Sequence, residues 1–203
     1  MSVQSILERV LQAVDQEAYL TPVEQVDGRF REALSEVAAA LADPSKHPDE
    51  CRGLARALHR EGKLDAVHLY SALHVIAASP RVKDYAEAAR WAAEQESAAL
   101  RAGGASLEAN LASVDRHRGV LAFLQGHFEV ALDYFARALE RQRTPENVGN
   151  LLCALVRLGE LDEALDLLSH LRRVLPASFV RALDERLHED PDLRPLTNLE
   201  RDA

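Results

Sequence analysis

A glycine recurs along the chain at intervals close to 33 or 34 residues, and a similar pattern of side chains follows it each time. An apolar residue comes two positions after the glycine, and a proline follows it by 16 to 19 positions. The interval is 34 residues from Gly28 to Gly62 and 33 from Gly126 to Gly159. Between them, from Gly62 to Gly126, it is 64 residues, which is close to two periods. A period of this length indicates repeated supersecondary units, and it constrains the fold more than any other feature of the sequence.

The repeated unit predicts a pair of antiparallel helices. Glycine accepts the left-handed backbone conformation that ends one helix and turns the chain. The helix that follows places its apolar residues on one face, and a small or β-branched residue five positions after the glycine lets the paired helix approach closely. These residues are Ala33, Val67, Ala131 and Ala164. One such pair cannot bury its apolar face alone, so the units are expected to stack.

The last two units are the most regular. They contain Gly126-His-Phe-Glu-Val-Ala-Leu-Asp-Tyr-Phe-Ala-Arg-Ala-Leu and the stretch from Gly159 to Pro176. Both resemble the tetratricopeptide repeat family, whose unit of 34 residues is a helix–turn–helix. The resemblance covers residues 46–80 and 112–176, and extends more weakly over 21–45. One departure is Arg118, which precedes Gly119 at a position where the family has leucine.

We therefore expect an all-α fold, a bacterial α-solenoid of about ten helices in one domain over residues 1–203. Its expected segments are N-terminal helices with a weak repeat (1–45), three repeats (46–80, 112–144 and 145–176), an irregular middle (81–111), a capping helix (177–190) and a tail of loose coil (191–203).

The middle segment lacks the glycine signature and is either a degenerate repeat or an insertion. Residues 82–101 predict one long helix that ends at Gly103 and Gly104, and Ser106 is expected to cap the next helix. Its expected apolar stripe consists of Tyr85, Ala88, Ala89, Ala92 and Ala99.

Composition narrows the function. The net charge is −9, which disfavours binding to nucleic acid because an acidic chain repels phosphates. No stretch approaches about 18 uncharged apolar residues, so we expect no membrane insertion. Residues 1–10 lack the pattern of an export signal, which favours a location in the cytoplasm.

Cys51 and Cys153 lie within apolar helical patterns and are expected to be buried, reduced thiols.

No motif for catalysis, a cofactor or a metal is recognisable. The glycine pair follows no strand and lacks the spacing of a nucleotide-binding loop. His68 and His74 are six positions apart, which places them on different faces of a helix, and no Cys-x-x-Cys pair occurs. The sequence therefore predicts a protein that is not an enzyme and has no cofactor.

Basic side chains on the first helix of the second unit form the candidate binding surface. Arg52, Arg56 and Arg60 are four residues apart, with His59 beside them. Arg116 lies at the offset from Gly126 that Arg52 has from Gly62. The resemblance implies that the first helices line a concave groove, and that Asn150 lies where the family grips a ligand backbone. Val120 stands where a second polar contact would be needed.

A basic groove suits an acidic segment or a C-terminal carboxylate. The alternative is that these arginines form a solvated face and pair with acidic residues of neighbouring helices.

The leading hypothesis for the function is a protein–protein interaction module or adaptor that binds a partner peptide or helix in the groove. One alternative is a chaperone that resembles the small acidic chaperones of bacterial type III secretion and holds a hydrophobic client protein. Another is a self-assembling component, such as a homodimer, that pairs through the N-terminal stripe Ile6, Leu7, Val10, Leu11 and Val14.

Overall fold

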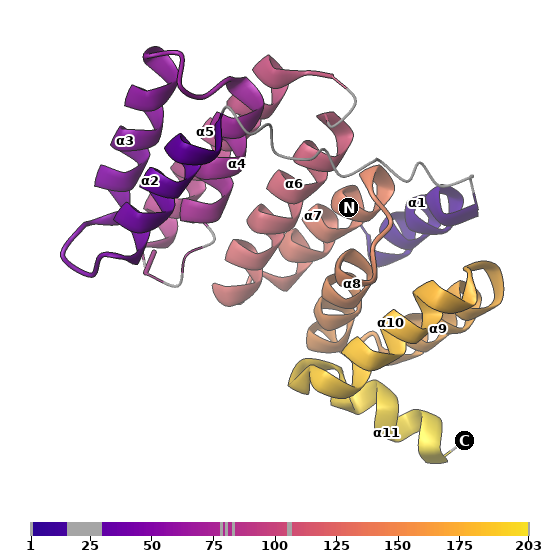
Figure 1. Ribbon diagram of the computed structural model, residues 1–203. Helices are drawn as coiled ribbons and strands as arrows, with labels where there is room; N and C mark the ends of the chain where they lie inside the picture. Colours follow the sequence, from indigo (N-terminus) through magenta and orange to yellow (C-terminus); the bar gives the residue numbers. More distant parts are fainter. Residues whose placement is uncertain are drawn as a thin grey trace. The chain divides into compact units, whose positions relative to one another are not determined.

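Helices form all the regular structure in the part of the chain that the computed structural model describes (Figure 1). The described residues are 2–15, 30–77, 79, 81–82, 84–104 and 107–202. They contain eleven α-helices and a short 3-10 helix, and within these ranges there is no strand. The predicted all-α class is confirmed. Two predicted features, the turn at Gly28 and the cap at Ser106, lie outside the described residues.

Ten of the helices lie in the segments for which the sequence predicted helices, and the last lies in the predicted tail. The helices are α1 (Val3–Asp15), α2 (Arg31–Ala42), α3 (Pro48–Arg60), α4 (Ala66–Ala77), α5 (Tyr85–Ala102), α6 (Leu107–Leu124), α7 (Phe128–Arg141), α8 (Pro145–Leu158), α9 (Leu161–Val174), α10 (Ala177–Glu189) and α11 (Arg194–Asp202), with the 3-10 helix η2 (Pro191–Leu193) between the last two. None of the helices among the described residues is both long enough and apolar enough to cross a membrane.

The chain divides into two compact units. Unit 1 comprises Met1–Leu20 and Arg118–Ala203, and unit 2 comprises Thr21–His117. Within unit 1, α1 packs against α7 and α9, which lie more than 100 residues further along the chain.

The core of unit 1 consists of the apolar faces of α1 and of helices α7 to α10. Ala131 and Ala164, two of the predicted small residues, are 0% exposed. The predicted turn after α8 is present, since Gly159 has φ 84° and occupies the left-handed region. Thr144 begins α8 by accepting a hydrogen bond from the Asn147 backbone N–H at 3.1 Å. The cap at Thr144 and the turn at Gly159 therefore set where α8 begins and ends.

Two glycines allow close packing within unit 1. A Cβ on Gly119 of α6 would lie 2.4 Å from Cε1 of Phe135 on α7. A Cβ on Gly149 of α8 would lie 2.2 Å from Nε of Arg186 on α10. Any larger side chain would have to displace these neighbours, so both helix contacts depend on glycine.

Unit 2 has a separate core formed by α2 to α5 and the first part of α6. Helix α3 begins with a capping box: the His47 side chain accepts from the Asp49 backbone N–H, and Glu50 accepts from the His47 backbone N–H. Gly62, with φ 73°, forms the predicted turn after α3.

Helix α5 spans most of the predicted long helix, but its buried face differs in part. Ala88, Ala92 and Ala99 are buried as expected, whereas Ala89 is exposed. The side chain of Tyr85 lies outside the described residues. The stripe also contains Trp91, Gln95 and Ala98, which the alanine pattern did not single out.

The prediction of loose coil over 191–203 is wrong. Its two prolines begin helical segments instead of breaking them, because a proline in the first turn needs no backbone N–H partner. Asp190 caps the 3-10 helix by accepting from the Asp192 backbone N–H at 3.0 Å. Leu193 and Leu196 are both 0% exposed and complete the core of unit 1. Helix α10 is therefore not the last helix of the unit.

The two leucines of α11 offer a test of this packing. Leu196 is fully buried, whereas Leu199 is 40% exposed. We expect Leu196→Ala to lower the free energy of unfolding by about 2–5 kcal/mol, because it leaves a cavity, and Leu199→Ala to lower it much less. Urea denaturation followed by circular dichroism measures both. Equal, small effects would mean that residues 194–202 do not pack on unit 1.

Candidate functional site

The two central arginines of the predicted basic surface bind an acidic residue of their own unit. Arg52 and Arg56 of α3 both form ion pairs with Glu94 of α5, and Arg56 Nη2 donates to Glu94 Oε2 at 2.6 Å. Burial of the Glu94 carboxyl raises its pKa, but the hydrogen bonds from Arg56 and Arg52 outweigh this effect and bring the pKa below its usual value. This arrangement matches the alternative in which the arginines pair with acids of a neighbouring helix.

Arg52 is more deeply held than Arg56. Its guanidinium carbon lies 4.1 Å from the ring centroid of Trp91, and its Nη1 donates to Asp49 Oδ1 at 2.8 Å. The residue is only 8% exposed, whereas the Arg56 side chain is 40% exposed. A cation that stacks on an aromatic ring and pairs with two carboxylates is already satisfied inside the protein.

The other predicted residues are dispersed. His59 contacts its own turn, with Nδ1 2.7 Å from the Leu64 carbonyl oxygen, and Arg60 is exposed. Arg116 of α6 is half-buried. Asn150 belongs to unit 1, where its Oδ1 accepts from Arg186 Nη2 of α10 at 2.8 Å. Within unit 2, the structure therefore brings Arg52 and Arg56 together around Glu94.

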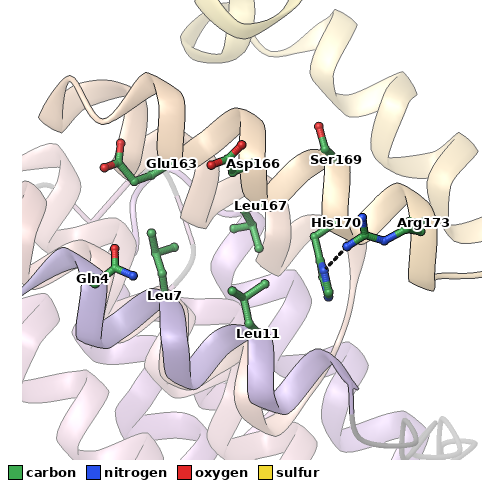
Figure 2. A pocket seen from close by; sticks show the side chains of 9 residues that line it. All are labelled: Gln4, Leu7, Leu11, Glu163, Asp166, Leu167, Ser169, His170 and Arg173. Atoms are coloured by element: carbon green, nitrogen blue, oxygen red, sulfur yellow. Dashed lines mark hydrogen bonds between the residues drawn. The ribbon is translucent and has the colours of Figure 1, made fainter.

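A cleft between α1 and α9 is the better candidate for a binding site (Figure 2). Its volume is about 390 Å³. Figure 2 shows Leu7 and Leu11 of α1 and Leu167 of α9 lying between the two helices, where they form an apolar floor. Leu7 and Leu167 are 6% and 3% exposed, and Leu11 is half-buried. Apolar residues in a concave surface with polar groups around them are typical of binding sites.

The rim of this cleft is charged, with opposite signs along α9. Glu163 and Asp166 lie toward the start of the helix, and Arg173 lies near its end. Arg173 Nη2 is 2.9 Å from Nδ1 of His170, so the basic end is a linked pair. Among the described residues, neither Glu163 nor Asp166 has a salt bridge or a side-chain hydrogen bond. The cleft therefore presents unneutralised acid at one end and base at the other.

The sequence pointed to half of this site. The stripe of Ile6, Leu7, Val10 and Val14 indicated that the N-terminal helix buries one face, and all four are buried in the core of unit 1. Self-assembly through this helix stays a prediction, although in this structure the stripe packs within unit 1. Which helix would receive the stripe was not recognisable, because an amphipathic pattern does not specify its partner.

A second polar cluster lies inside unit 2. The ring centroids of His74 and Tyr70 on α4 are 5.9 Å apart, and those of His74 and His117 are 6.2 Å apart. The Tyr70 hydroxyl donates to the Asn110 carbonyl at 2.8 Å. Burial lowers the pKa of each histidine to about 4, helped by the positive charge of Arg116, so both are neutral at pH 7.

The cysteines and histidines offer no assembled reactive site in the described part of the chain. Cys51 and Cys153 are buried and free, as predicted, and burial raises the pKa of both thiols, that of Cys153 to about 12. Within the described ranges, no group of three or more histidine, cysteine or acidic side chains could hold a metal ion.

The Glu94 cluster gives a prediction on stability. Glu94→Gln removes the charge shared by Arg52 and Arg56 and leaves a buried guanidinium with one carboxylate. We expect the free energy of unfolding to fall by about 1–3 kcal/mol in urea denaturation, and by much less for the control Glu87→Gln on the same helix. An unchanged stability of Glu94→Gln would show that the arginines do not depend on this pairing.

The histidine pair gives a prediction on pH dependence. Because the folded pKa is about 4 and the unfolded pKa about 6.5, the unfolded chain binds more protons between these values. The free energy of unfolding is therefore unaffected by the two histidines above pH 6.5. It falls as the pH drops toward 4, by roughly 2–3 kcal/mol for each histidine. The variant His74→Gln/His117→Gln should lose distinctly less over the same range in urea denaturation. Parallel pH profiles of the two proteins would contradict this assignment.

Comparisons with known proteins give no match: no protein-family model, no curated protein and no solved structure matches the chain. The likeness to the tetratricopeptide family consequently rests on the residues quoted for it in the sequence. The charges, distances and burial described above are the grounds for assigning a function.

Proposed function

We propose that this protein is a non-catalytic binding module of the cytoplasm that holds a segment of a partner protein in the cleft between α1 and α9. The observation that carries the proposal is the apolar floor of Leu7, Leu11 and Leu167 beneath a rim whose acidic end forms no salt bridge with the described residues. A partner segment that inserts apolar side chains and presents a basic residue to Glu163 and Asp166 would satisfy both features.

The proposal keeps the kind of function that the tetratricopeptide likeness implies but moves the binding surface. In the basic surface first considered, Arg52 and Arg56 already share Glu94. A partner carboxylate would have to compete with a pre-formed internal pair, which is unfavourable when the guanidinium is buried. The rim acids Glu163 and Asp166 face no such competition.

A role in catalysis is disfavoured by the state of the reactive groups. Both cysteine thiols are buried with raised pKa values, so little thiolate forms at neutral pH. His74 and His117 are neutral, and their rings pack against Tyr70 and against each other. A chaperone for a hydrophobic client is one form of the same proposal, in which apolar residues of the client occupy the leucine floor.

Site-specific photocrosslinking tests the proposal. A photoreactive amino acid at Ser169, on the exposed rim of the cleft, is expected to capture a partner from lysate of the cells that express the protein. The same probe at Glu185, exposed on α10 and away from the cleft, is expected not to capture it. The double charge reversal Glu163→Lys/Asp166→Lys should abolish the Ser169 product, because the rim acids recognise the basic residue of the partner.

The matched control is Glu8→Lys/Glu189→Lys, which changes the net charge equally at two exposed residues that do not line the cleft. This control should leave the Ser169 product intact. If Ser169 and Glu185 capture the same proteins, or if both double variants behave alike, the cleft is not the binding site.

A further inference from the structure

The face of unit 1 that lies beneath α1 has the features of a receptor for a single amphipathic helix. Helix α1 presents Ile6, Leu7, Val10 and Val14 to it, and these side chains are between 0% and 6% exposed. The receiving helices are α7 and α9, the second helices of the two most regular repeats. A helix that is remote in sequence thus occupies this face through one stripe.

Charge complementarity fixes how the helix lies on this face. Arg9 Nη2 is 3.1 Å from Asp133 Oδ1, and Arg9 Nε is 3.0 Å from Glu140 Oε1. The two acids are seven residues apart, which places them two turns apart on the same side of α7. A single basic side chain between them sets the position of α1 along α7 as well as its rotation.

Both flanks of α1 are hollow. The cleft toward α9 measures about 390 Å³, and a second hollow of about 270 Å³ lies between α1 and α7, where it is lined by Ile6, Val130 and Tyr134 among others. Val130 is 51% exposed. Between these hollows, α1 contacts the rest of unit 1 through its apolar stripe and the pairs of Arg9.

We propose that the face of α7 and α9 is a binding site for an amphipathic helix of a partner protein, and that α1 is the built-in occupant that this helix displaces. The partner helix carries apolar residues at the spacing of the α1 stripe and a basic residue at the position of Arg9. This inference does not depend on what the cleft between α1 and α9 binds. A helix of 13 residues is marginal alone in water, so the face that orders α1 can equally order a separate helix.

The covalent attachment of α1 makes the site self-inhibited. Because α1 is part of the same chain, its binding to the face is intramolecular and does not depend on the protein concentration, so a free helix competes poorly until α1 is weakened. The affinity of the site for an external helix should consequently rise when α1 alone is altered.

The test uses the full-length protein and a fluorescein-labelled peptide of residues 2–15, with binding followed by fluorescence anisotropy. We expect Val10→Asp, which places a charge in the buried stripe, to bind the peptide at least about tenfold more tightly than the unaltered protein. Gln12→Asp adds the same charge at an exposed position of α1 and is expected to bind as weakly as the unaltered protein.

A second variant, Arg9→Glu, keeps the proposal testable if Val10→Asp unfolds the protein. Arg9→Glu loosens α1 by charge repulsion without altering the apolar stripe, and it should raise the affinity for the peptide in the same way. A peptide carrying Arg9→Glu should bind the Val10→Asp protein about tenfold more weakly. Adding Asp133→Lys/Glu140→Lys to that protein should restore the binding of the altered peptide.

Three results would overturn the proposal. One is that Val10→Asp and Arg9→Glu keep the helicity of the unaltered protein but bind the peptide no better. Another is that the charge of residue 9 in the peptide has no effect. The third is a dimer of the unaltered protein, seen by sedimentation equilibrium and lost in Arg9→Glu, since this would assign the face to α1 of a second copy.

Discussion

The burial of the α1 stripe against α7 and α9 is the contact from which both proposed binding surfaces of unit 1 derive. It joins residues far apart in the chain: Arg9 and Asp133, which pair across this contact, are 124 positions apart. Closing a loop of this length costs conformational entropy, which the apolar burial of Val10 and its neighbours must offset. The cleft beside α9 follows from this one contact.

The charged side chains fall into two groups with different consequences. Arg52 is buried against Trp91 and shares Glu94 with Arg56, so its charge serves the stability of unit 2. Glu163 and Asp166 line an accessible cleft without such pairing. A group that is already paired and desolvated gains little from a partner, whereas a group on an accessible rim can gain a charge-assisted hydrogen bond. This difference is why the binding surface is assigned to α9 rather than to α3.

Local signals in the sequence were sufficient for the helices but not for their long-range partners. Helix α9 (Leu161–Val174) lies within the regular unit that the sequence placed from Gly159 to Pro176. The pairing of Arg52 with Glu94 joins residues 42 positions apart and could be anticipated only as an alternative. The tail was predicted as coil, whereas Pro191 begins the 3-10 helix, as a proline at the first helical position can. The cleft could not be predicted from the sequence, because it forms only when α1 packs beside α9.

Hydrogen–deuterium exchange of the full-length protein tests most directly whether α1 is docked. The amides of residues 6–14 should exchange far more slowly than those of the isolated peptide of residues 2–15, but faster than those of α7 and α9, because α1 can leave its face while the rest of unit 1 stays folded. The account would be contradicted if these amides exchanged at the rate of the free peptide while α7 and α9 remained protected.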